Sequence, residues 1–400
     1  MEILLIGLLL IVGLALGTLG SYFFHVPRVV GYILAGIMFA PDFLGGALGI
    51  ESAEWTLPMV AVALGIVAYL IGGAVTVSQL RQLGWVIVTA TLGKVSGSFL
   101  AVLAGFLLLG LTVPELSNNS LALLLAAIST TTAPAAIVAI THQYRARGPL
   151  TTALLGMVAL DDAIALIIFS LVLASLQSSG FNAAIPALIW EIGAAISFGM
   201  LGGLLIERVA RYLPEQELRL VVLLGGIILL TGLAQIWDFS PLLTAITLGF
   251  SARLFGGAHS ESLFRPLEKL QEVVFVLFFT FAGLHFNPAV ILGHAWLILL
   301  YFVLRAGGQI FGAWLGAKLA GAPRVISHNV GLVMLPQGGV AIGMALLLTG
   351  VAGLEGLALL VVNIITASTI LTETLGALGT RYGLARAGEI GAASKTLKGE

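Results

Sequence analysis

The sequence contains no cysteine and very little charge. Without cysteine the chain forms neither disulfides nor thiolate metal sites. Only 9% of its 400 residues are Asp, Glu, Lys or Arg, compared with about 25% in ordinary globular domains. The sequence has no basic run or low-complexity tract, so we expect no nucleic-acid partner. The scarcity of charge also argues against a soluble protein.

Apolar residues make up 59% of the chain, and the mean hydropathy is +1.10. They recur in long, non-alternating runs that match the ~20 residues of a bilayer-spanning helix. Only helices and closed barrels satisfy every backbone polar group in lipid, and barrel strands require alternation. The pattern therefore predicts an all-α polytopic membrane protein. The 50 glycines suit close helix packing and helix breaks.

The runs predict about 13 transmembrane helices, of which 27–41 and 240–255 are short for a full span. The predicted helices lie near residues 2–24, 27–41, 56–77, 83–111, 119–141, 149–177, 185–210, 217–237, 240–255, 268–285, 294–319, 327–350 and 354–380. The residues from Ala385 onward are more polar, and we expect them to form a frayed tail.

The loop cations lie on one side of this predicted topology. Sixteen of the 18 Lys and Arg residues fall in alternate loops or after the last helix. Short loops rich in Lys and Arg stay cytoplasmic. The distribution therefore predicts a protein of the cell (inner) membrane, with its N-terminus outside and its C-terminus in the cytoplasm.

The two remaining cations, Lys94 and Arg305, fall near the centres of predicted helices, as do the adjacent acids Asp161 and Asp162. A charge at this depth in the bilayer is costly, so it indicates a functional site by default. These four residues are therefore the first candidates for such a site.

Two predicted helices, 119–141 and 327–350, contain residues that break a helix near their centres. Pro134 and Pro336 each remove a backbone donor and clash with the preceding turn. The other polar or flexible residues at these breaks are Ser129, Thr130, Thr131, Thr132, Gly338 and Gly339. Unwound backbone is tolerated in a membrane only where it is buried in protein or lines a cavity. Its carbonyls and half-helix ends suit a cation or a countercharge.

The order of these features occurs twice along the chain. Each half has a basic helix, a broken helix and an acidic helix, marked by Lys94, Pro134 and Asp161–Asp162 in the first half and by Arg305, Pro336 and Glu373 in the second. The two sets are seven helices apart, and an odd offset gives the halves opposite orientations. This is the inverted repeat of secondary transporters, whose binding site lies between the repeats.

Taken together, these motifs resemble the monovalent cation:proton antiporters, which include bacterial Na+/H+ antiporters, Kef-type proteins and sodium/proton exchangers. The segment VVGYILAGIMFAPDFLG is similar to the family's early glycine-rich helix, and FSPLLTAITLGFSARL to its later counterpart. Asp161–Asp162 matches the twin-carboxylate motif, the break near Thr130 the crossover helix, and Arg305 the basic residue two helices before the end.

The resemblance implies a homodimer in membrane lipid. It also implies the following division: 1–82 and 213–290 as dimerisation-domain helices, 83–177 and 291–382 as the core domain, 178–212 as a linker helix and 383–400 as a cytoplasmic tail. No cofactor is expected, and the predicted partners are Na+ or K+ and H+ as substrates.

Under the resemblance, Asp162 is the primary ligand of the metal cation. Asp161 and oxygens of Ser129, Thr130, Thr131 and Thr132 complete the ion- and proton-binding set. A hard monovalent cation prefers such oxygen ligands, as calcium and magnesium do. Burial favours the protonated form of a carboxyl group, so a proton competes with the cation for one site. Competition at an alternately exposed site is antiport.

Three further residues, Arg305, Lys94 and Glu373, form a charge-compensating set. Arginine keeps its proton, so Arg305 predicts electroneutral exchange of about one Na+ or Li+ per H+. Lys94 departs from the family pattern; if it pairs with Asp161 and titrates, exchange is electrogenic instead. Glu373 lies close to Arg381 and has the alternative of a cap or a side chain reaching the membrane surface.

Other functions are compatible with parts of the sequence. Within antiport, K+ is the alternative cation, and a Na+-coupled symporter of an organic anion or a channel are further alternatives. An enzyme is not expected, because an intramembrane aspartyl protease needs two aspartates on different helices. Asp161 and Asp162 are instead adjacent on one helix.

Overall fold

The computed structural model describes residues 2–24, 28–48, 54–74, 84–113, 119–177, 181–237, 239–257, 260–285, 288–351 and 353–390. Across these residues it contains helices and connecting turns but no strand. It has two compact units: one comprises Met1–Leu57, Leu83–Asp162 and Val276–Glu400, and the other Pro58–Gln82 and Ala163–Phe275.

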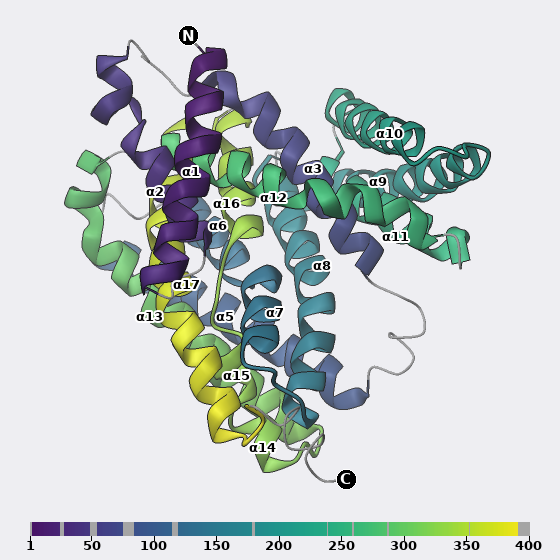
Figure 1. Ribbon diagram of the computed structural model, residues 1–400. Helices are drawn as coiled ribbons and strands as arrows, with labels where there is room; N and C mark the ends of the chain where they lie inside the picture. The colour runs from purple at the N-terminus through teal and green to yellow at the C-terminus, as the bar shows by residue number, and fades with distance from the viewer. Residues whose placement is uncertain are drawn as a thin grey trace. The chain divides into compact units, whose positions relative to one another are not determined.

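The first unit contains the elements that position the candidate site (Figure 1). Its α-helices are α1 (Glu2–Phe24), α2 (Arg28–Met38), α5 (Trp85–Thr112), α6 (Asn119–Ser129), α7 (Pro134–Gln143), the first half of α8 (Pro149–Gln177), the end of α12 (Ser260–Leu284), α13 (Pro288–Leu319), α14 (Arg324–Ser327), α15 (Val330–Val333), α16 (Gly339–Leu347) and α17 (Glu355–Arg386). Shorter helices are η1 (Pro41–Gly45), η2 (Glu54–Thr56) and η5 (Leu348–Gly350).

The second unit consists of α3 (Leu57–Ala74), α9 (Phe181–Arg211), α10 (Gln216–Ile236), α11 (Pro241–Gly256) and the remaining parts of α8 and α12. Helices α9, α10 and α11 pack side by side (Figure 1). At the crossing of α3 and α11, a Cβ built on Gly72 would lie 1.9 Å from the carbonyl oxygen of Ile246, so only glycine allows this approach.

Long apolar helices confirm the prediction of a polytopic membrane protein. In the described part of the chain, eight helices are long and apolar enough to cross a membrane: Ile3–Phe23, Arg28–Gly45, Trp85–Thr112, Pro149–Leu176, Ile192–Arg211, Gln216–Ile236, Gly293–Leu319 and Glu355–Arg386. Four shorter apolar helices accompany them, at 57–73, 119–129, 241–256 and 339–350. Each predicted span coincides with a helix or, at the two breaks, with a group of short helices.

Some predicted helix boundaries are wrong. Helix α12 begins at Ser260 rather than near residue 268. The prediction missed its first turns because they are amphipathic and charged, and low hydropathy there is typical of a loop. Helix α17 continues to Arg386. The additional turns of both helices contain polar residues, so the search for apolar runs in the sequence did not include them.

The end of α17 also corrects the expectation of a frayed tail, at least up to residue 390. Glu389 is 4% exposed. Its carboxylate accepts hydrogen bonds from the backbone N–H groups of Leu150 (2.7 Å) and Thr151 (2.8 Å) and from the Thr151 hydroxyl (2.7 Å). It therefore caps the N-terminus of α8, whose free N–H groups and dipole favour an anion. The residues beyond 390 lie outside the described part.

Helices α5 and α13 pack against each other over a long stretch. Their contact is a stripe of glycines: a Cβ on Gly312 would lie 2.1 Å from the Gly93 carbonyl oxygen, and one on Gly316 would lie 2.1 Å from that of Thr89. Small residues at this spacing let two membrane helices approach backbone to backbone. The crossing brings Lys94 of α5 and Arg305 of α13 into one region.

Both predicted helix breaks are confirmed. Helix α6 ends at Ser129 and α7 begins with Pro134, where a missing N–H costs nothing. Residues 334–338 run without helical structure between α15 and α16, and Figure 1 shows this stretch as a thin ribbon. The backbone N–H of Ala133 in the first break donates to the carbonyl of Pro336 in the second, at 2.9 Å. The two breaks therefore meet.

Candidate functional site

Arg305 connects the two breaks through their backbone carbonyls. Its guanidinium donates from Nε to Ser129 O (3.1 Å), from Nη2 to Thr131 O (2.7 Å) and from Nη1 to Leu335 O (2.9 Å). The side chain is fully buried. Broken helices leave carbonyls without intrahelical donors, and Arg305 supplies fixed donors to three of them. The predicted charge-compensating position of Arg305 therefore coincides with the carbonyl-rich ends of the breaks.

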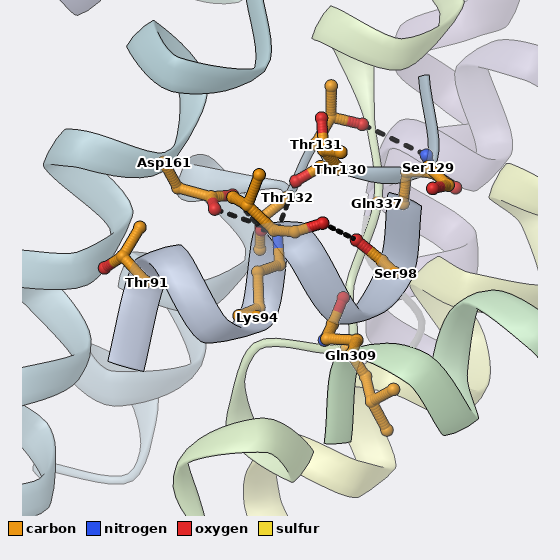
Figure 2. A network of polar contacts seen from close by, with 12 residues as sticks. Thr91, Lys94, Ser98, Ser129, Thr130, Thr131, Thr132, Asp161, Gln309 and Gln337 are labelled. Carbon is orange, nitrogen blue, oxygen red and sulfur yellow. Dashed lines mark hydrogen bonds and ion pairs between the residues drawn. The ribbon is translucent and has the colours of Figure 1, made fainter. Parts of the chain in front are cut away.

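Lys94 binds Asp161 and the first break (Figure 2). Its Nζ lies 2.9 Å from Oδ1 and 2.7 Å from Oδ2 of Asp161, and 2.7 Å from the Thr132 hydroxyl. It also donates to the carbonyl of Thr130. Thr132 in turn donates its hydroxyl proton to Asp161. An ammonium has three donors, and here each has an oxygen partner, so Lys94 has no donor left for a further ligand. Both members of the Lys94–Asp161 pair are fully buried.

Asp162 contrasts with its neighbour Asp161. It is 1% exposed, yet neither of its carboxylate oxygens has a hydrogen-bond partner in the described part of the chain. Asp161 and Lys94 interact with it electrostatically, and the backbone N–H of Thr132 lies near it without meeting full hydrogen-bond geometry. A buried carboxylate without partners is costly, and Asp162 is the acid of the pair whose charge no direct contact balances.

The other predicted ligands occupy the end of α6. The hydroxyls of Ser129, Thr130 and Thr131 donate to the carbonyls one turn back, at 2.6, 2.7 and 2.9 Å. All three side chains are fully buried. Because these protons are already donated, the hydroxyl oxygens present lone pairs, as a cation ligand must.

Gln337 is a site residue that the sequence interpretation did not assign. Its Nε2, which carries two N–H donors, lies 3.0 Å from each of three acceptors: Ile128 O, the Thr131 hydroxyl and the Tyr301 hydroxyl. Figure 2 shows Gln337 facing the hydroxyls of the first break. Its backbone carbonyl accepts from Thr372 at 3.2 Å. An amide between Pro336 and Gly338 was the signal that could have identified it.

Glu373 of α17 lies at the second break, beside Gly338. It is 1% exposed, and its Oε2 has no hydrogen-bond partner in the described residues. A Cβ built on Gly338 would lie 2.8 Å from Glu373 Oε1 and 3.0 Å from the Ala133 Cβ. Gly338 is therefore needed where the breaks and the carboxylate converge. Burial rules out the alternative that Glu373 reaches the membrane surface.

Contacts join Lys94 to Asp161, Thr130 and Thr132, join Arg305 to Ser129 and Thr131, and place Glu373 beside Gly338, while Pro134 and Gly339 border the breaks. Each begins the helix that follows its break, α7 and α16 respectively. Two basic residues are held by oxygens, Asp161 is paired, and Asp162 and Glu373 keep oxygens without partners.

Comparison with known proteins identifies the family of the chain. Residues 6–378 match the model of the family described as sodium/hydrogen exchanger, transmembrane. The chain therefore belongs to the sodium/hydrogen exchanger family, within the monovalent cation:proton antiporter superfamily. It is a membrane transporter of a cation and protons.

Solved structures show the same fold. The sodium proton antiporter MjNhaP1 from Methanocaldococcus jannaschii at pH 8 superposes with a TM-score of 0.72 at 19% identity, covering 96% of both chains. An electron-microscopy structure of MjNhaP1 gives a TM-score of 0.71 at 19% identity, covering 97% of this chain and 96% of that one. A comparison with proteins of curated function finds no match.

Proposed function

We propose that this chain exchanges Na+ or Li+ for H+ by alternating access, with Asp162 as the carboxylate that the two ions occupy in turn. The observation that carries the proposal is the buried carboxylate of Asp162, which has no side-chain hydrogen-bond partner in the described residues and lies near the backbone of Thr132 in the first break. A hard monovalent cation requires oxygen ligands and a countercharge. Asp162 supplies the charge, and Ser129, Thr130 and Thr131 supply neutral oxygens.

The neighbouring charges support a division of roles. Asp161 neutralises Lys94, and Thr132 bridges them, so these three hold the first break in place. Arg305 holds the carbonyls of both breaks. The cation site is thereby positioned without consuming the charge of Asp162.

The same contacts support electroneutral exchange. Arginine keeps its proton, and the ammonium of Lys94 is paired with the Asp161 carboxylate, so its charge is already balanced. Only Asp162 is then left to exchange a proton for a cation at this site. One cation entering for one proton leaving carries no net charge.

The experiment is proton flux in vesicles that contain purified protein. Na+, Li+ and K+ are added in turn to native protein and to Asp162→Asn, with Thr152→Val as a control whose hydroxyl donates to its own helix end. We expect Na+- and Li+-driven flux in native protein and the control, and its loss in Asp162→Asn. Native exchange by Asp162→Asn would remove Asp162 from the site; flux driven by K+ alone would make the protein a K+/H+ antiporter.

The stoichiometry is tested in the same vesicles. With the membrane potential clamped by a K+ ionophore or left free, electroneutral exchange proceeds at the same rate. A rate that depends on the potential would show that a second proton moves, and Lys94 would be its carrier.

We also propose that the protein is a homodimer in the cell membrane. Detergent-solubilised protein should have the mass of two chains by light scattering, and a monomeric mass would contradict this.

A further inference from the structure

The two halves of the molecule share a common spacing between base and acid. Glu373 follows Arg305 at the separation at which Asp162 follows Lys94, 68 residues in each case (94 to 162 and 305 to 373). Each base is followed three residues later by a glycine, Gly97 or Gly308. Glu373 is therefore the counterpart of Asp162 in the second repeat.

The two glycines that follow these bases also occupy equivalent places in the structure. A Cβ on Gly97 would lie 2.2 Å from the carbonyl oxygen of Gly308, and a Cβ on Gly308 would lie 2.3 Å from that of Gly97. Two equivalent positions thus face each other reciprocally across the α5–α13 contact, as an inverted repeat requires. The bases on these helices, Lys94 and Arg305, are related in the same way.

Glu373 resembles Asp162 in its surroundings as well. Both acids are 1% exposed and have carboxylate oxygens without partners in the described part of the chain. Arg305 interacts with Glu373 electrostatically, but their charged atoms are not paired within hydrogen-bond distance. Glu373 also lies beside Gly338, the N-cap of α16, where the helix dipole favours a negative charge. The carboxylate of Glu373 is therefore not neutralised by direct contact with a base.

Two hydroxyls on the same helix complete a set of oxygen ligands. Thr369 and Thr366 precede Glu373 by four and seven residues, so the three share one face of α17. Both threonines are fully buried and both Oγ1 atoms lack partners in the described residues. The other serine and threonine hydroxyls of α17 instead donate to backbone carbonyls, those of Ser368, Thr372, Thr374 and Thr380. A glutamate side chain on a helix points back toward the preceding turn, which is where Thr369 lies.

The charges of the region favour a cation rather than an anion. The buried charged residues at the breaks are Lys94, Arg305, Asp161, Asp162 and Glu373. With all of them ionised, the acids exceed the bases by one. A buried net charge is costly, and one monovalent cation or one proton removes it, whichever of Asp162 and Glu373 it occupies.

We propose that Glu373, Thr369 and Thr366 form a second ion-binding site, at which Na+ or Li+ displaces a proton from Glu373. In the first repeat the neutral oxygens come from the broken segment, and in the second they come from α17 itself. This site goes beyond the proposed exchange at Asp162 and does not require Asp162.

The experiment measures protons released when NaCl or LiCl is added to unbuffered, detergent-solubilised protein, with choline chloride as the blank. Asp162→Asn should still release protons in a saturable way, and adding Glu373→Gln should abolish the release. In the Asp162→Asn background, Thr366→Val with Thr369→Val should raise the half-saturating concentration about tenfold, as expected for two lost oxygen partners. The matched control is Ser368→Ala with Thr374→Val, which should leave it unchanged.

Native protein and Glu373→Gln, which keeps Asp162, provide the second measurement. Glu373→Gln should release fewer protons than native protein while both elute as a single species in gel filtration. The second site is refuted if Asp162→Asn releases no protons while native protein does, because Glu373 is then only a countercharge to Arg305. If native protein itself releases none, the Asp162 proposal fails as well.

Discussion

Lys94 and Asp161 form an ion pair in surroundings where an isolated charge costs several kcal/mol. The pair persists because every Nζ donor has an oxygen partner, including a backbone carbonyl exposed by the broken helix. The sequence identified both residues as costly and functional, and it left open whether they pair. The choice of Asp161 over Asp162 depends on side-chain direction, since the two acids point about 100° apart on one helix.

The pair predicts a strong dependence of stability on Lys94. Lys94→Met leaves Asp161 buried without its countercharge, and we expect a loss of about 3–5 kcal/mol of unfolding free energy. Lys94→Met with Asp161→Leu removes both charges and should recover most of it. Thermal unfolding in detergent measures this double-mutant cycle.

Lys318→Met is the matched control, because this exposed lysine of the neighbouring α13 only stacks on Trp314, at 4.8 Å. It should cost no more than about 1 kcal/mol. Equal losses for Lys94→Met and Lys318→Met would show that the buried pair does not stabilise the fold.

At the scale of elements, glycine spacing and helix breaks determine how the helices of the first unit pack. The breaks at Pro134 and Pro336 were predictable because proline acts on its own backbone. That the breaks meet, with Ala133 donating to Pro336, was not predictable, because the two residues come from separate repeats. The α5–α13 contact was likewise only implied by an abundance of glycine.

The glycine contact predicts opposite effects for two neighbouring substitutions. Gly312→Ala places a Cβ 2.1 Å from the Gly93 carbonyl oxygen, so the helices must separate, at a cost of about 1–3 kcal/mol. Gly307→Ala meets nothing within 4 Å and should be neutral or slightly stabilising, since alanine is the better helix former. Thermal unfolding of both variants decides the matter; a Gly312→Ala protein as stable as Gly307→Ala would mean that the contact is loose.

At the scale of the whole molecule, the charge bias of the loops and the inverted repeat describe one topology. An odd offset between repeats requires the halves to cross the membrane in opposite senses. The match to the sodium/hydrogen exchanger family over residues 6–378 extends across both halves. The direction in which the molecule sits in the membrane follows from the cations alone and stays a prediction.

The absence of cysteine makes this direction measurable with single introduced thiols. Tyr212 follows α9 and precedes α10, and it is 83% exposed. Trp237 follows the other end of α10 and is 51% exposed. The positive-inside distribution predicts that Tyr212→Cys reacts with an impermeant maleimide only from the cytoplasmic face, and Trp237→Cys only from outside. The reverse labelling pattern would invert the proposed topology.

The sequence by itself determined the membrane-spanning class, the helix order, the two breaks and the candidate site residues. Hydropathy, proline and loop charge act within single segments, so their effects can be predicted from the sequence. Only the tertiary structure decided that Lys94 neutralises Asp161 across 67 residues, that Arg305 holds both breaks, and that Asp162 and Glu373 keep oxygens without partners. Those outcomes depend on which way side chains point and on where helices cross, and close glycine contacts allow the crossing of α5 and α13.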